Sequence, residues 1–380
     1  MKEAGLDALA CTLPENVLLL TGYFPVVGTS VAIATREGEI LLFAPEDEMD
    51  LADCDCTENL VSFRPGSLDA LTNAEQAIRE PLRGKLRGKG LDRAVIGYEC
   101  GAAFEPASYA SMHLYGNSTM ELLEGAALRP ASELLARLKA VLTPIELDRV
   151  RRACRIAEAA YERGASCLAA GLKETEAAAA FRTPLVVTGT GFEGVRRAEG
   201  YVFCMAGAHS AQAYGAYARS HATEIEIADF VLTHCNSHAD GYWTDITRTY
   251  CIGPAMAEQH KAYGAIFAAR QAALGAIRPG VKAADVDRAA RASLDGAGYG
   301  GHFKHATGHG VGFAAINHNA RPRLHPKSAD RLESGMVFNV EPAVYIEGFG
   351  GLRHCDMVAV TETGAELLTP FHSHVEELIR

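Results

Sequence analysis

The sequence predicts an α+β protein of two domains, the first of them a smaller α/β domain. Before about residue 140, short β-like runs alternate with helical stretches, which is typical of an α/β domain with a mixed sheet. After that point, helical stretches are interleaved with strand-like runs that favour antiparallel pairing over a doubly wound sheet. We therefore expect one domain at 1–140 and a second at 141–380.

The elements of the first domain are short. Apolar and β-branched residues predict strands at 7–11, 30–34, 39–43 and 94–98, and helical patterns lie at 45–52 and 67–83.

A helix start marks the second domain. Thr143 at the N-cap, Pro144 at the first helical position and Glu146 at the third form a capping box. We expect this helix to run to about Ala170 and to stop at Gly171. Further helices are predicted at 175–181, 255–277 and 282–297, and strands at 201–206, 226–233, 336–346 and 357–361.

Composition narrows the class of protein. The 380 residues are 48% apolar and 22% charged, as in a folded domain. A formal net charge of −11 argues against nucleic acid or an anionic membrane as a partner. The ten cysteines are scattered without a CxxC pair, and the early apolar runs are too short for a membrane span. These features predict a cytoplasmic protein.

Histidine is distributed unevenly, since thirteen of the fourteen follow residue 200. The segment from His234 to Thr249 predicts a β-hairpin with polar, metal-capable side chains. Alternation places Asp245, Thr247 and Thr249 on one face. A carboxylate inside a strand needs a partner, which is either a ligand or a cation such as Arg248.

Three later segments carry further candidate residues. Glycines flank His309, so that the backbone can approach a ligand closely, and His305 would face the same pocket if this turn were helical. Glu341 ends an apolar strand, where a buried carboxylate needs a cation or a proton. Arg353 begins the segment Arg-His-Cys-Asp, which opens the last strand pair.

In this order the four segments resemble metallopeptidase family M24, which includes aminopeptidase P, prolidase, methionine aminopeptidase and creatinase. The opening residues 4–9, 14–17 and 20–22 are similar to the start of a creatinase-type N-terminal domain. The resemblance implies a pita-bread catalytic domain at 141–380 preceded by a creatinase-like α/β domain, and it implies a homodimer.

The resemblance also implies a metal site. Family metallopeptidases use two Asp, one His and two Glu for two ions. Asp245, His309 and Glu341 stand at three of these positions, whereas His234 stands at the first Asp and Cys355 at the final Glu. The expected ligands are therefore His234, Asp245, His309, Glu341 and Cys355.

Family positions imply the remaining roles. His305 matches a catalytic histidine, and a further expected histidine falls on Ile316, so that His318 nearby is expected to serve instead. Tyr214 stands where a substrate-side histidine is expected, close to His209. We therefore expect catalytic roles for His305, His318, Glu341 and Arg353, and substrate binding by Tyr214 and His209.

Charge counting favours a single ion. Asp245 and Glu341 carry two negative charges, and Cys355 adds one only as a thiolate. Two divalent ions would leave a large uncompensated positive charge, so this set suits one divalent ion per chain. A His, Asp and Glu set of this kind prefers zinc, iron or manganese.

Several functions remain open. The first is a hydrolase that cleaves an amide or peptide-like C–N bond of a small molecule or short peptide with a mononuclear metal site. A second is a metal-free, creatinase-like hydrolase that uses His and Glu as acid and base. The others are an ordinary Xaa-Pro dipeptidase or aminopeptidase and a non-catalytic binding protein.

Overall fold

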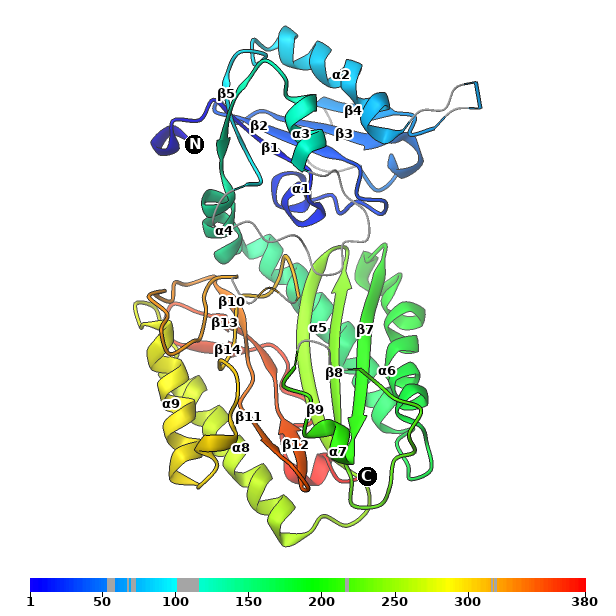
Figure 1. Ribbon diagram of the computed structural model, residues 1–380, viewed down its shortest axis with the longest axis vertical. Coiled ribbons are helices and arrows are strands. Elements are labelled where there is room, and N and C mark those ends of the chain that lie inside the picture. Colours follow the sequence, from blue (N-terminus) through cyan, green and yellow to red (C-terminus); the bar gives the residue numbers. More distant parts are fainter. Residues whose placement is uncertain are drawn as a thin grey trace. The chain divides into compact units, whose positions relative to one another are not determined.

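The computed structural model describes residues 1–52, 59–66, 68–69, 73–100, 116–215, 219–315, 317 and 320–380. The chain divides into two compact units, Met1–Lys139 and Ala140–Arg380 (Figure 1). Helices and strands alternate in the first unit, whereas helix pairs flank antiparallel strands in the second. The expected α+β class is confirmed.

The first unit is built on a six-stranded mixed sheet with the order β4-β3-β2-β1-β5-β6. Its strands are β1 (Ala8–Cys11), β2 (Val31–Thr35), β3 (Ile40–Pro45), β4 (Leu60–Phe63), β5 (Val95–Tyr98) and β6 (Ala127–Pro130). Its helices are α1 (Pro14–Thr21), α2 (Ala74–Gly88), α3 (Gly116–Leu122) and α4 (Ser132–Ala140). Alternate strand residues serve two cores, since Ile33 and Phe43 belong to one with Ile78 of α2, and Leu9 belongs to the other with Leu135 of α4.

The helix predicted at 45–52 is wrong. Only a 3₁₀ turn forms, at Glu46–Glu48. The buried Glu48 carboxylate accepts hydrogen bonds from Tyr23 Oη at 2.5 Å, Val26 N at 2.7 Å and Val27 N at 3.0 Å. These tertiary contacts fix Glu48 in a turn, against the local helical pattern. The second predicted helix instead begins after Asn73 with a capping box, and positions 67 and 70–72 lie outside the described residues.

The second unit has three small sheets with the orders β7-β8-β9, β10-β13-β14 and β11-β12. Its strands are β7 (Ala198–Ala206), β8 (Phe230–Ala239), β9 (Tyr242–Cys251), β10 (Val337–Val340), β11 (Ala343–Ile346), β12 (Gly350–Arg353), β13 (Asp356–Val360) and β14 (Ala365–Leu367). Its helices are α5 (Pro144–Ala165), α6 (Glu174–Gly189), α7 (Gly207–Ser210), α8 (Ala257–Ala276) and α9 (Ala283–Gly296). Figure 1 shows the α5/α6 pair on one side of these strands and the α8/α9 pair on the other.

The capping box that opens this unit forms as predicted. Thr143 Oγ1 accepts from Glu146 N at 3.3 Å, and Glu146 Oε2 accepts from Thr143 N at 2.7 Å. The helix ends at Ala165, five residues before the expected Ala170. The strand predicted at 336–346 is two strands in different sheets, because Pro342 between them has no N–H for a continuous ladder.

Within the described part of the chain, we find no helix that is both long and apolar enough to cross a bilayer.

Candidate active site

The β8–β9 hairpin sets the first two candidate residues side by side. Its register pairs His234 with Thr247 and Asn236 with Asp245, so these side chains share one face. His234 Nδ1 lies 3.0 Å from Thr247 Oγ1 and 3.7 Å from Asp245 Oδ1. Burial lowers the pKa of His234 to about 4, and Arg353 adds to the shift, so this imidazole is neutral at pH 7.

His309 approaches Asp245 from the opposite oxygen, with Nε2 at 3.6 Å from Oδ2. Its segment is extended rather than helical, and Gly308 and Gly310 form isolated bridges with Leu324 and Phe338. A Cβ on Gly308 would lie 1.9 Å from Asn339 O, and one on Gly310 would lie 2.1 Å from Arg321 O. These glycines therefore admit neighbouring backbone, which corrects the interpretation that they make room for a ligand.

Glu341 directly follows β10 and faces Arg353 at the end of β12, with Oε2 3.7 Å from Nη1. Burial raises the pKa of Glu341 to about 8, although Arg353 opposes that shift. Arg353 also donates from Nε to Thr247 Oγ1 at 3.0 Å. The pair is thus tied to the hairpin through Thr247.

Cys355 lies between β12 and β13 and is fully buried. Its thiol donates to the main-chain oxygen of Asp245 at 3.2 Å and lies 3.7 Å from Asp245 Oδ1. Burial raises the pKa of this thiol well above its ordinary value, and Asp245 and Glu341 add to the shift. Without an ion beside it, these surroundings favour the protonated thiol of Cys355 over the thiolate.

His305 contacts a tyrosine that the sequence did not single out. Its Nδ1 lies 2.8 Å from Ala306 O, an acceptor, so Nδ1 carries the proton and Nε2 accepts from Tyr345 Oη at 3.0 Å. Tyr214 packs edge-on against Tyr345, with ring centroids 5.5 Å apart, and Lys304 Nζ lies 4.3 Å from the Tyr214 ring centroid. The position of Tyr345 in a strand four residues after Glu341 was the available signal.

Asp245 is thus the centre of the predicted set. His234, His309 and Cys355 each approach one of its carboxylate oxygens within 3.7 Å. Nevertheless, among the described residues these side chains supply no three donor atoms that all lie within 4.8 Å of one another. His318 lies outside the described residues.

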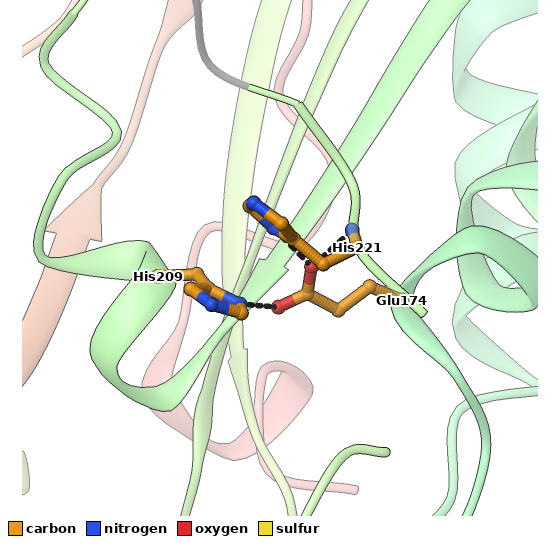
Figure 2. Close-up of side chains that lie close together, drawn as sticks. All are labelled: Glu174, His209 and His221. Carbon is orange, nitrogen blue, oxygen red and sulfur yellow. Dashed lines mark hydrogen bonds and ion pairs between the residues drawn. The ribbon is translucent and has the colours of Figure 1, made fainter. Parts of the chain in front are cut away.

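His209 belongs to a different cluster. It contacts Glu174 at the start of α6 and stacks on His221, and these three residues offer ligand atoms that all lie within 4.8 Å of one another. Figure 2 shows both imidazoles on the same side of the Glu174 carboxylate. Sequence reasoning missed Glu174 and His221, which lie 35 and 12 residues from His209 and form no local pattern.

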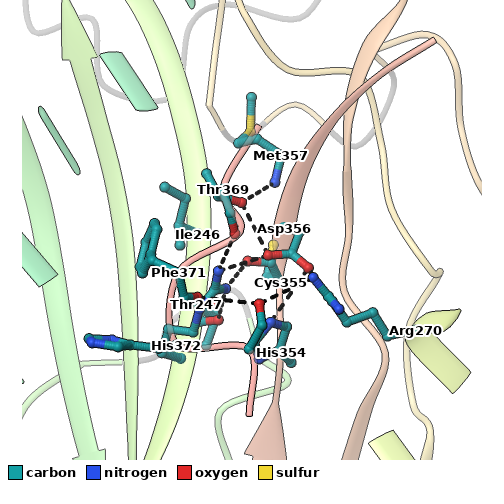
Figure 3. A network of polar contacts seen from close by, with 12 residues as sticks. Ile246, Thr247, Arg270, His354, Cys355, Asp356, Met357, Thr369, Phe371 and His372 are labelled. Atoms are coloured by element: carbon teal, nitrogen blue, oxygen red, sulfur yellow. Dashed lines mark hydrogen bonds and ion pairs between the residues drawn. The ribbon is translucent and has the colours of Figure 1, made fainter. Parts of the chain in front are cut away.

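A buried ionic network supports the Cys355 side of the active site. Asp356 accepts from Arg248 Nη2 at 2.8 Å and from Arg270 Nε at 2.5 Å. Figure 3 shows Arg270 pointing toward the Asp356 carboxylate. Arg248 Nη1 also donates to Cys355 O at 2.7 Å. Burial opposes ionisation of Asp356, but Arg248, His354 and Arg270 hold its pKa well below the ordinary value. Arg248 therefore pairs with Asp356 and not with Asp245. This excludes Arg248 as the cation that compensates the buried Asp245 carboxylate.

Comparison with known proteins agrees with this architecture. Residues 148–362 match metallopeptidase family M24, which is more than half of the chain, so the protein belongs to this family. The pita-bread fold, which follows a smaller N-terminal domain in the chain, is confirmed. The protein is a hydrolase of C–N bonds, as expected.

Individual relatives cover most of the chain. It is 32% identical to the probable dipeptidase PepE of Mycobacterium tuberculosis over 278 residues, which is 73% of this chain and 70% of the relative. It is 26% identical to a Xaa-Pro dipeptidase of Pyrococcus furiosus over 371 residues, covering 97% and 95%. Among solved structures, the prolidase from Pyrococcus furiosus matches with a TM-score of 0.75, 26% identity and coverage of 97% and 98%. The dipeptidase from Pyrococcus horikoshii OT3 matches with a TM-score of 0.77, 26% identity and coverage of 100% and 97%.

Proposed function

We propose that the protein hydrolyses an amide or peptide-like C–N bond of a small molecule or short peptide at the Asp245-centred site, with one divalent ion of zinc, iron or manganese. The supporting observation is that each oxygen of Asp245 faces one imidazole nitrogen, at 3.7 Å for His234 and 3.6 Å for His309. Each separation by itself suits two neighbouring ligands of one ion with bonds of about 2.1 Å, although the two imidazoles must move toward each other before all three residues can bind the same ion. His234, Asp245 and His309 would hold the ion.

The local charges support one ion rather than two. Asp245 is one negative charge, the charge of an ionised Glu341 would be offset by Arg353, and burial favours the protonated thiol of Cys355. A second dication would meet no further anionic ligand and would be opposed by the buried Arg353. Glu341 and Cys355 would therefore lie beside the single ion and would not bind a second one.

Protein groups would carry the proton transfers. A bound divalent ion would polarise the substrate carbonyl and lower the pKa of water. Glu341 would accept a proton in its ionised form, which Arg353 favours and burial opposes. His305 keeps an unprotonated Nε2 toward Tyr345 through its bond to Ala306 O, so this nitrogen would first take up that proton and then deliver it to the departing amine.

A metal-free, creatinase-like hydrolase is the second candidate. The observation that favours it is the spacing of the donors, since no three donor atoms of the Asp245 set converge within 4.8 Å in the described residues. Glu341 and His305 would then supply the acid and base, and Arg353 would bind the polar substrate.

The relatives suggest a starting substrate panel. Xaa-Pro dipeptides and other dipeptides are the first choice, because relatives of this chain carry the names Xaa-Pro dipeptidase and dipeptidase. We also propose a cytoplasmic homodimer, which sedimentation velocity would test.

Metal analysis of protein purified without chelator or affinity metal tests the main proposal. It should include His234→Ala and, as a matched histidine loss elsewhere, His325→Ala at an exposed position. A loss of about one zinc, iron or manganese per chain in His234→Ala, with no loss in His325→Ala, would support a mononuclear site. Failure to bind any of these ions, even after incubation, would shift the assignment to acid–base chemistry. Two ions that are lost together would indicate an ordinary dinuclear dipeptidase.

A further inference from the structure

We propose that Glu174, His209 and His221 form a second site, for one transition-metal ion of the zinc class, that fixes the segment between β7 and β8. This proposal is independent of the proposed function. One carboxylate and two imidazoles are a donor set that suits zinc and its neighbours in the first transition row. Their ligand atoms all lie within 4.8 Å of one another, which is true of no other group of three among the described His, Cys, Asp and Glu residues.

Three separate parts of the chain converge at this cluster. Glu174 opens α6, His209 lies on α7, and His221 lies in the segment that leads to β8. Backbone bonds set the placement, because Glu174 N donates to Thr223 O at 3.0 Å and Thr175 N donates to His221 O at 3.3 Å. The cluster is therefore held by the fold and does not depend on flexible surface side chains.

The distances bring each imidazole into direct contact with the carboxylate. His209 Nδ1 lies 2.7 Å from Glu174 Oε1, and His221 Nδ1 lies 3.1 Å from Oε2. The Glu174 side chain is fully buried, whereas His209 and His221 are 29% and 33% exposed. An ion could thus enter from solvent, take its charge-bearing ligand from the interior and complete its coordination with water.

A structural role for Glu174 alone does not require two histidines. Its oxygens already accept the main-chain N–H groups of Ala206 at 2.7 Å, at the end of β7, and of His221 at 2.6 Å, within the segment that leads to β8. The imidazoles come in addition, and their rings stack with centroids 3.9 Å apart. Two protonated imidazoles at that separation would repel each other, whereas one shared dication satisfies both nitrogens and the carboxylate.

Metal binding would change the rings in a defined way. Coordination through Nδ1 moves the ring proton to Nε2 on each histidine, where it can meet water. The rings are now inclined by only 27°, and an ion must lie in the plane of both, so they must turn out of the stack. Both histidine side chains are partly exposed to solvent, which is the side toward which the rings can rotate.

The site would act on the active site through α7. Ser210 Oγ accepts from Gly351 N at 2.8 Å, and a Cβ on Gly351 would lie 1.9 Å from Ser210 O, so α7 packs directly on β12. That strand ends at Arg353, and the segment after α7 carries Tyr214. An ion at Glu174 would therefore hold α7 and Tyr214 in place relative to Arg353.

A calorimetric titration of chelator-stripped protein with Zn²⁺ tests the proposal. A double variant Asp245→Asn/His309→Gln removes the Asp245 site and should still bind one Zn²⁺ per chain. Adding His209→Gln and His221→Gln should weaken that binding at least about tenfold. The matched control adds His302→Gln and His325→Gln in their place, which should leave it unchanged. The proposal fails if the Asp245→Asn/His309→Gln protein binds no Zn²⁺, or if its affinity does not depend on His209 and His221.

Nitrogen NMR of the wild-type protein guards against a variant that fails to fold. Zn²⁺ should shift the Nδ1 signals of His209 and His221 and should move their protons to Nε2. If Zn²⁺ instead shifts only the histidines of the Asp245 site, no ion binds at Glu174 and the proposal is overturned.

Discussion

The Asp245 site and the Glu174 cluster are built in opposite ways. The first takes His234 and Asp245 from the interior of the β8–β9 hairpin and its other residues from later strand ends and loops, and its donors surround Asp245 without any three of them converging. The second takes its residues from a helix start, a short helix and a loop, and both histidines touch one carboxylate. Family motifs therefore located the buried residues around Asp245, whereas the converged donor set lies where no motif pointed.

The largest expected effect is a loss of overall stability, which would disrupt the Asp245 site and the Glu174 cluster together. Asp356→Asn leaves Arg248 and Arg270 buried without their carboxylate, which should lower the free energy of unfolding by about 3–5 kcal/mol. Urea denaturation followed by circular dichroism would measure the loss. Asp285→Asn, which breaks an exposed pair with Arg288, should cost less than about 1 kcal/mol. Equal costs for the two changes would show that the buried network contributes little.

Asp245→Asn should silence the active site and leave the Glu174 cluster intact. Loss of the carboxylate that faces both imidazoles should lower kcat/KM at least about a hundredfold, the scale of one catalytic group. The assay uses whichever dipeptide the wild type cleaves, and Zn²⁺ binding at Glu174 is measured alongside. Asp240→Asn is the control, because Asp240 accepts from Arg197 N at the hairpin turn and Asn tolerates its positive φ. Retained activity in Asp245→Asn would remove Asp245 from the chemistry.

Restoring the family ligands would sharpen the comparison. His234→Asp together with Cys355→Glu adds two carboxylates beside Asp245, so the Asp245 site should bind a second divalent ion. Metal analysis in a His209→Gln/His221→Gln background would count ions at the Asp245 site alone. An unchanged count in folded protein would mean that side-chain charge does not limit occupancy.

The smallest expected effect is the loss of stability at acidic pH that comes from the buried His238. Burial, with a smaller effect of Arg197, lowers the pKa of His238 from 6.5 to about 3. The unfolded chain therefore binds a proton below pH 6.5 that the folded chain binds only near pH 3, and stability is lost as the pH falls between these values. From pH 7.5 to pH 5 this histidine should account for about 2 kcal/mol. Over this pH range, the free energy of unfolding from urea denaturation should fall by about 2 kcal/mol less in His238→Gln than in the wild type. In His325→Gln it should fall as much as in the wild type. Parallel profiles for the wild type and His238→Gln would contradict the shift.

The sequence predicted those parts of the fold that depend on local signals. The Thr143 capping box and the alternation along the hairpin from His234 to Thr249 both specify backbone geometry within a few residues. The helix at 45–52 failed because Glu48 is held by Tyr23, a residue distant in sequence. His238 is buried in β8, because the strand continues to the tight turn at Asp240 and Gly241.

The candidate site was predicted where strand ends carry motifs, and it was missed where contacts are tertiary. Alternation placed Asp245 and Thr247 on one face, and the register confirms that geometry. The assigned catalytic and ligand roles remain predictions. No local pattern could reveal that Arg248 turns to Asp356, or that Glu174 meets His221. Such partners depend on packing between elements, which a single sequence does not display.

The ten-pair ladder of the β8–β9 hairpin has a consequence for how this scaffold can change. The register runs without a break from Phe230 with Cys251 to Ala239 with Tyr242, and alternate pairs exchange main-chain hydrogen bonds, which do not depend on the side chain at position 234. Exchanges at that position therefore alter reactivity while the pocket keeps its shape. A library at His234 and Cys355 that is limited to residues of similar size should therefore keep the hairpin, and it could be searched for new chemistry.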